Sequence, residues 1–245
     1  IMNREGDGNK IVSIVSSNSD SKETQFEISL PETVGAKAPR LLTPRETILE
    51  QERTLTLEDK GDSRKYYVYV KGDVVYTTDQ VADAITKANE NMGVVVGKDQ
   101  KYIWKRSREA IRPALSDIAV GAEDASSNSI AQCINAMLEK EGINISVSAL
   151  IAGGETPKNI LSNTMKDARI LDLTGCSVEE VLYYVSCGNP VFAMTGSDEA
   201  VLVVGYDANN VIIFDPSTGS NFKQSLTDAD EVFKEAGNVF FTYLK

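Results

Sequence analysis

The 245-residue sequence contains no histidine, although it holds other side chains that could act as nucleophiles, acids or bases. Histidine is the side chain that most often transfers protons near neutral pH. Its absence excludes Ser/His/Asp and Cys/His triads in their usual form. The remaining candidates are three cysteines, Cys133, Cys176 and Cys187, and the carboxylates that border the segment Ala200–Asp207. Catalysis by this chain would therefore require an unusual base.

The cysteines and carboxylates do not have the spacing of a metal site. No CxxC pair is present, and the lack of histidine removes the usual partners of cysteine around zinc. The acidic residues 228, 230 and 231 lack the glycine and spacing of a calcium loop. We expect no metal and no cofactor. The odd number of cysteines favours buried thiols, with a bridge between Cys176 and Cys187 as the alternative.

Charge separates the two halves of the chain. Residues 1–120 carry 18 basic and 19 acidic side chains, whereas residues 121–245 carry 7 and 17. Phosphate neutralisation needs lysine and arginine, so the second half is predicted not to bind nucleic acid. The basic residues Lys101, Lys105, Arg106, Arg108 and Arg112 are interpreted as a solvated strand end and linker, with contact to an anionic polymer as the alternative.

Alternation of apolar residues predicts strands over residues 11–15 and 24–30, joined as a hairpin. In the less regular stretch after them, residues 44–53 favour a short helix and residues 54–57 a strand. Residues 65–105 have the pattern of a ββαββ unit, with two hairpins around a helix over residues 81–92. Thr78 or Asp79 is expected to cap this helix, Met92 to lie on its buried face, and Gly93 to end it.

Periodicity fades between residues 107 and 127, which places a domain boundary near residue 120. We therefore expect a small mixed α/β module over residues 1–120 and a second domain over residues 121–245. Helices are predicted over residues 130–138, 146–152, 157–165 and 178–186. Asn128 or Ser127 caps the first, and Ser177 with Glu180 forms a capping box for the last.

Strands come after these helices in the second domain. Residues 191–194, 200–206, 211–214, 222–224 and 239–244 have strand patterns, and a helix capped by Thr227 precedes the last of them. Gly153–Pro157 lacks the lysine of a phosphate loop and is interpreted as a turn between helices. Helices followed by antiparallel strands predict an α+β fold.

This order resembles the papain-like cysteine peptidases that process bacteriocin leaders, over about residues 125–245. The resemblance rests on the segment Ala200–Asp207, which contains Gly-Tyr-Asp, and on the Asp215-Pro216 pair after the next strand. It implies a papain-like fold in which a cysteine opens the first helix, a histidine begins the strand that leads to the Gly-Tyr-Asp turn, and an aspartate or asparagine follows the next strand. The helix dipole and the imidazolium would lower the thiol pKa.

Two of these three catalytic positions hold other residues here. Asp215 occupies the orienting position, Glu199 falls where the histidine would be, and Ser129 or Ile130 falls at the cysteine. Cys133 lies about one turn inside the helix, on its apolar side, where burial raises a thiol pKa. We therefore expect a domain that lacks peptidase activity.

Three functions remain as hypotheses. The first is an inactive papain-like domain that binds a peptide or protein as part of a larger bacterial surface or secreted protein. The second is a cysteine peptidase or amidase that uses Cys133 with a base other than histidine. The third is a purely structural domain. The sequence begins with Ile1 before Met2, which suggests an excerpt whose leader or membrane anchor lies outside it. The sequence does not indicate an oligomeric state.

Overall fold

The computed structural model describes residues 11–16, 24–29 and 66–245, and its contacts divide the chain into the units Ile1–Glu50 and Gln51–Lys245. In the first unit, β1 (Ile11–Ser16) and β2 (Thr24–Ser29) pair as the predicted antiparallel hairpin. The helix predicted over residues 44–53 and the strand over residues 54–57 lie outside the described residues. The boundary near residue 120 stays a prediction, since residues 66–245 all belong to the second unit.

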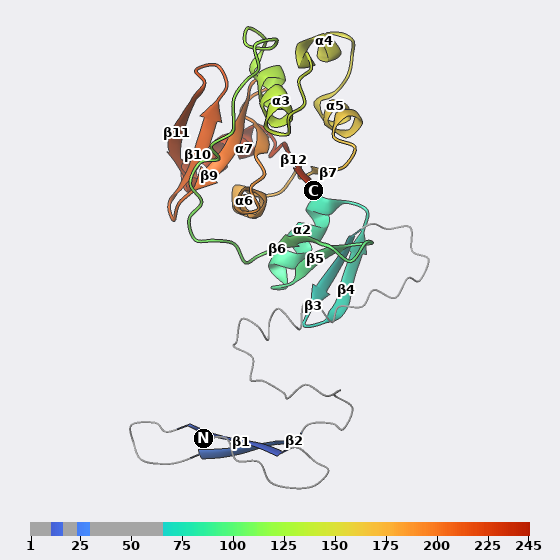
Figure 1. The fold of residues 1–245 in the computed structure, drawn as a ribbon, viewed down its shortest axis with the longest axis vertical. Helices are drawn as coiled ribbons and strands as arrows, with labels where there is room; N and C mark the ends of the chain where they lie inside the picture. Colours follow the sequence, from blue (N-terminus) through green and yellow to red (C-terminus); the bar gives the residue numbers. More distant parts are fainter. Residues whose placement is uncertain (1–10, 17–23, 30–65) are drawn as a thin grey trace. The chain divides into compact units, whose positions relative to one another are not determined.

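Residues 66–105 form the predicted ββαββ arrangement (Figure 1). Its strands are β3 (Tyr66–Val70), β4 (Asp73–Thr78), β5 (Val94–Gly97) and β6 (Tyr102–Lys105), and they lie in the order β4-β3-β5-β6. Helix α2 (Val81–Glu90) contacts three of these strands, and its apolar stripe is buried. The helical spacing of that stripe is the property on which the prediction rested.

The two ends of α2 differ from the prediction. Gln80 occupies the N-cap without a side-chain cap, because Thr78 Oγ1 accepts from the backbone N–H of Gln80 instead. Met92 is 80% exposed rather than buried, and it takes the left-handed conformation expected of Gly93. Gly93 has a different role, since a Cβ there would lie 2.5 Å from the carbonyl oxygen of Tyr69. The missing side chain permits the close approach of β3.

A six-stranded sheet forms the centre of the remaining chain, and all its pairings are antiparallel. Its order is β11-β10-β9-β8-β12-β7. The strands are β7 (Arg169–Asp172), β8 (Val191–Met194), β9 (Ala200–Tyr206), β10 (Asn210–Asp215), β11 (Ser220–Ser225) and β12 (Phe240–Leu244). Helices followed by antiparallel strands therefore make this a mixed α and β fold, as predicted.

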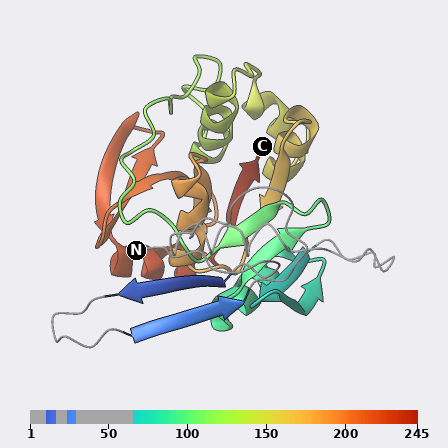
Figure 2. The same cartoon turned by 60° about the horizontal axis from the view of Figure 1, so that its bottom comes forward.

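Helices pack on both faces of this sheet. Leu202 and Val204 of β9 share a core with α3 (Ser129–Lys140), α4 (Val147–Ala152) and α5 (Pro157–Thr164), whereas Val203 joins the core of α6 (Val178–Ser186) and α7 (Leu226–Glu235). Alternating side chains on a strand point to opposite faces, which explains the division. Figure 2 shows α3, α4 and α5 (lime to yellow) grouped together, apart from α7 (red).

The helix caps are mostly those predicted. Asn128 accepts from Ala131 N at the start of α3, and Ser177 with Glu180 forms the capping box of α6. Helix α7 differs, because Ser225 rather than Thr227 accepts the capping hydrogen bond, from Asp228 N. The helix therefore begins directly after β11, two residues earlier than predicted.

The ββαββ module shares a hydrophobic core with α6. Val68, Ile85 and Trp104 of the module belong to the same buried cluster as Leu182 and Val185 of the helix. The indole N–H of Trp104 also donates to the carbonyl oxygen of Glu180, at 2.9 Å. Burial of this kind normally joins elements of one domain.

Candidate functional site

Ser129 and the start of β9 are in direct contact. Ser129 is the first residue of α3, and its Oγ accepts a hydrogen bond from Ala200 N at 3.0 Å. Glu199, exposed and directly before Ala200, accepts from Thr195 N through its backbone carbonyl. Ile130 comes next after Ser129 and is half-buried. The positions expected for nucleophile and base therefore lie close together. Among the described contacts, however, no hydrogen bond joins the Ser129 hydroxyl to the Glu199 carboxylate.

Asp215 ends the neighbouring strand β10, at the register position beyond the pair Phe214 and Leu202. Its carboxylate accepts from Ser217 N at 2.9 Å, Ser217 Oγ at 2.6 Å and Thr218 Oγ1 at 3.0 Å. The hydrogen bonds from Ser217, followed by those from Thr218, hold the pKa of this carboxyl below its ordinary value despite partial burial. Asp215 thus closes the turn between β10 and β11.

Cys133 is completely buried in α3, one turn after Ser129. Burial raises the pKa of its thiol well above the ordinary value, and the negative charge of Asp215 raises it further. A thiol that stays protonated is a weak nucleophile. All three cysteines are free, with Cys176 buried and Cys187 exposed, so the alternative bridge between Cys176 and Cys187 is wrong.

The Gly-Tyr-Asp motif has a structural explanation, because the linker of residues 107–120 pairs with the end of β9. Arg112 and Tyr206 exchange both backbone hydrogen bonds, each 2.8 Å long, and Leu115 N donates to Val204 O. A Cβ on Gly205 would lie 2.8 Å from Arg112 O and 2.9 Å from Ala114 N. The linker can therefore lie against β9 only because residue 205 has no side chain.

Tyr206 and Asp207 complete this arrangement. The register shift between β9 and β10 makes Val204 an extra residue, and such a bulge turns the next side chains to the other face. Tyr206 consequently joins the α6 core, where its hydroxyl donates to Glu109 O at 2.8 Å. The Asp207 carboxylate accepts from Lys223, Asn209 and Asn210, in that order of influence, and these bonds strongly lower its pKa.

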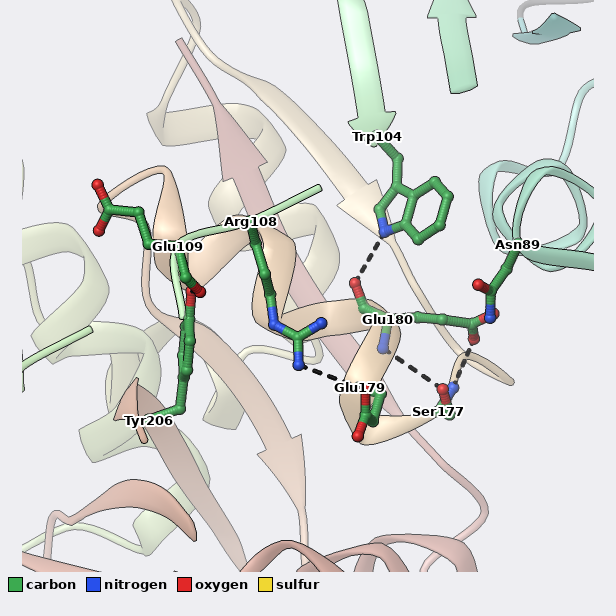
Figure 3. A network of polar contacts seen from close by, with 8 residues as sticks. All are labelled: Asn89, Trp104, Arg108, Glu109, Ser177, Glu179, Glu180 and Tyr206. Carbon is green, nitrogen blue, oxygen red and sulfur yellow. Dashed lines mark hydrogen bonds and ion pairs between the residues drawn. The ribbon is translucent and has the colours of Figure 1, made fainter. Parts of the chain in front are cut away.

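A polar network that the sequence prediction missed joins α2, β6 and α6 (Figure 3). Glu180 accepts from Asn89 Nδ2 through one carboxylate oxygen, at 3.1 Å, and from Ser177 N through the other, at 2.8 Å. Nearby, Arg108 pairs with Glu179 at 3.3 Å. The capping box was readable because it is local, but the contact with Asn89 spans 91 positions and leaves no periodic signal.

Hollows lie beside β6. One of about 110 Å³ lies beside Trp104, Arg108 and Glu179, and another of about 230 Å³ lies between Asp99, Tyr102 and Arg169. Neither is lined by Ser129, Glu199 or Asp215. Among the described residues, no group of three or more acidic or cysteine side chains could hold a metal ion. The described ranges also contain no helix long and apolar enough to cross a membrane.

No family model matches the chain, and no curated protein matches it. Among solved structures, it is similar to a Bacillus anthracis protein provisionally described as a C39-like peptidase. The two are 19% identical, and the match covers 58% of this chain and 96% of the other, with a TM-score of 0.41. A likeness of this extent carries no conclusion about activity.

Proposed function

We propose that residues 121–245 form a catalytically inactive relative of the papain-like cysteine peptidases. The domain would bind a peptide or protein as part of a larger bacterial surface or secreted protein. The proposed location outside the cytoplasm rests on the sequence resemblance alone. In this proposal, residues 66–105 are a module fixed to the domain rather than a mobile appendage, in keeping with the core that they share with α6.

One observation carries the proposal. The start of α3 contacts the start of β9 through Ser129 Oγ and Ala200 N, next to Glu199 and one strand from Asp215. This is the relative placement that the resemblance implies for nucleophile, base and orienting carboxylate. Ser129 Oγ instead accepts from a backbone N–H, and the Asp215 carboxylate accepts from its own turn. A fold that is retained while its nucleophile and base are replaced favours a binding role over hydrolysis.

The reactivity of Cys133 tests the absence of cysteine catalysis. Because Cys187 is exposed and would react in any case, the measurement uses the Cys187→Ser variant with a thiol-specific chromogenic reagent at pH 7.5. We expect negligible reaction of the native protein, and reaction of both remaining thiols after denaturation. A thiol in the native variant that reacts faster than free cysteine would overturn the inactive assignment. Cys133→Ser in the same background would identify that thiol.

Peptide binding is tested separately by amide chemical shifts. Pools of extended peptides should perturb the amides of Ser129, Ile130 and Glu199 in the folded protein. Glu199→Trp places a large side chain at an exposed position beside Ser129 and should abolish these shifts, whereas Leu150→Trp on the exposed side of α4 should preserve them. If no pool produces saturable shifts, the purely structural alternative is favoured. Equal loss in both variants would show that the effect is not local.

A further inference from the structure

Strand β11 is the outer edge of the six-stranded sheet, and residues 220–223 of this strand are exposed (Figure 1). The opposite edge, β7, is only four residues long, and its Arg169 forms an ion pair with Asp99 of the ββαββ module. No described residue pairs with the outer side of β11. An uncovered edge strand presents backbone groups that can pair with another strand.

The hydrogen bonds between β10 and β11 determine which backbone groups point outward. Leu226 N donates to Asn209 O at 2.8 Å, just beyond the paired residues of the two strands, so this pair is hydrogen-bonded. Hydrogen-bonded and non-hydrogen-bonded pairs alternate along an antiparallel ladder. Phe222, four positions before Leu226, therefore turns its N–H and C=O toward β10, whereas Asn221 and Lys223 turn theirs away. Two N–H donors and two C=O acceptors thus point out of the sheet at this edge.

The side chains of β11 add one aromatic ring and no unbalanced charge to this edge. Phe222 is 45% exposed and lies on the same face as Ile213, its partner on β10. Lys223 is the sole charged residue of the strand, and its ammonium pairs with Asp207, 2.8 Å away. Uncompensated charge on β11 therefore does not oppose the approach of another strand.

A second copy of β11 can satisfy the outward backbone groups in an antiparallel register centred on Phe222. In this register, Asn221 of each copy faces Lys223 of the other, and each of these two pairs exchanges two backbone hydrogen bonds. The two copies of Phe222 then face each other in a non-hydrogen-bonded pair, the kind of pair in which side chains lie closer. A register centred on Lys223 would place two ammonium groups opposite each other, which is destabilising. The order of side chains thus favours one symmetric register.

We propose that β11 pairs with β11 of a second copy of this chain, antiparallel and centred on Phe222, so that the two six-stranded sheets become continuous. The two-fold axis makes the contact self-complementary, as in most homodimers. The backbone hydrogen bonds and one aromatic pair form a small contact, which is typical of a weak and reversible dimer. The contact does not use the side chains of Ser129, Glu199 or Asp215, so dimerisation and the proposed peptide binding can fail independently.

Sedimentation velocity of the folded full chain measures the association, between about 20 µM and about 1 mM in dilute salt. We expect the average mass to rise toward twice that of one copy. Each copy has a formal charge of -11, so about 0.5 M NaCl should screen the repulsion between copies and tighten the dimer at least twofold. A mass that stays that of one copy up to about 1 mM, or an association that salt weakens, would overturn the proposal.

Proline at an outward position separates edge pairing from folding. Asn221→Pro removes an outward N–H and leaves the bonds of Phe222 to β10 in place, so it should weaken the dimer at least tenfold. Asn221→Thr keeps the N–H at the same position and should change the affinity less than twofold. Equal affinity of the proline variant and the wild type would show that the association does not use this edge, and the proposal would be wrong.

A charge exchange at Phe222 tests the register and remains valid if Asn221→Pro fails to fold. Phe222→Lys and Phe222→Glu each place like charges opposite each other at the two-fold axis, so each should weaken the dimer at least tenfold. An equimolar mixture of the two variants places opposite charges there and should associate at least fivefold more tightly than either variant alone. A mixture that associates no more tightly contradicts the Phe222-centred register.

Hydrogen exchange identifies what covers the edge. In the wild type, exchange at the amides of Asn221 and Lys223 should slow at least threefold between about 20 µM and about 1 mM, because these two N–H groups are bonded only in the dimer. Slow exchange at both amides in a protein that stays monomeric would assign the edge to another segment of the same chain and overturn the proposal.

Discussion

Gly205 determines whether the linker of residues 107–120 can lie against β9. In Gly205→Ala, the new Cβ would collide with backbone atoms of Arg112 and Ala114, which cannot rotate away as a side-chain end could. We expect the free energy of unfolding to fall by about 1–3 kcal/mol. Hydrogen exchange should accelerate at the amides of Arg112 and Leu115, which donate to β9.

The matched control is Gly196→Ala, where the nearest atom to a new Cβ is 3.8 Å away. This variant should keep both the stability and the exchange rates of the linker amides. Wild-type exchange at Arg112 and Leu115 in Gly205→Ala would show that the linker does not need the space left by the glycine.

Cys133 should make the protein sensitive to alkali. Its pKa is raised in the folded state by burial, so the folded thiol keeps a proton that the unfolded thiol loses above a pH of about 8.5. The contribution of the protonated Cys133 thiol to the free energy of unfolding is therefore complete below that pH. It decreases as the pH rises toward the pKa of the folded state. Each such thiol reduces the free energy of unfolding by about 1.4 kcal/mol per pH unit in this range. Cys176 has the same direction of shift, also because of burial.

Urea unfolding at pH 8.0, 8.75 and 9.5 measures this dependence. Cys133→Ala should show a shallower decrease than the wild type, whatever its stability at pH 8.0. Cys187→Ala, which removes an exposed thiol, should keep the wild-type slope. Identical slopes in all three proteins would mean that Cys133 ionises equally in the folded and unfolded states.

At the scale of elements, Glu180 connects the start of α6 to α2. Glu180→Ala removes the hydrogen bonds from Ser177 N and Asn89 Nδ2 and should destabilise the fold by about 1–3 kcal/mol. A double-mutant cycle with Asn89→Ala should give a coupling free energy of about 0.5–1.5 kcal/mol. Glu179→Ala, at the exposed neighbouring position, should change the stability by less than about 1 kcal/mol. A coupling of zero would remove Glu180 as a connection between the elements.

The same helix shows how much of the fold could be predicted. The capping box of Ser177 and Glu180 was predicted because both hydrogen bonds join residues three apart. The caps of α2 and α7 were misassigned because several threonines, serines and aspartates compete near each start, and the path of the preceding strand decides among them. Local chemistry therefore determined the elements, and tertiary geometry determined their first residues.

The candidate site divides in the same way. The roles of Ser129, Glu199 and Asp215 were assigned from the family resemblance, and the structure places Ser129 against Ala200, the residue after Glu199. The occupation of Asp215 by its own turn was not predicted, although Ser217 and Thr218 lie just after it in the chain. The hollow beside Trp104, Arg108 and Glu179 was missed because its walls come from α2, β6, the linker and α6, and the basic residues that line it were interpreted as a solvated strand end and linker.

At the scale of the whole molecule, the shared core predicts that residues 66–245 unfold in one transition. Val68, Ile85 and Trp104 lie in one cluster with Leu182 and Val185, so the module cannot leave without exposing α6 to water. Trp104 fluorescence reports this junction, whereas far-ultraviolet circular dichroism reports helices on both faces of the large sheet. In a fragment of residues 66–245, the two probes should give the same urea midpoint and the same slope.

A mutation sharpens this test. Trp104→Phe keeps an aromatic ring but removes the hydrogen bond to Glu180 O, so it should lower the midpoint of the entire transition by circular dichroism. The control Val75→Ala changes an exposed side chain of β4 and should leave the midpoint nearly unchanged. Two separate transitions, or a midpoint shift confined to a small part of the dichroism signal, would instead favour independent domains divided near residue 120. One transition shifted as a whole would mean that the module and the six-stranded sheet fold as a single cooperative unit.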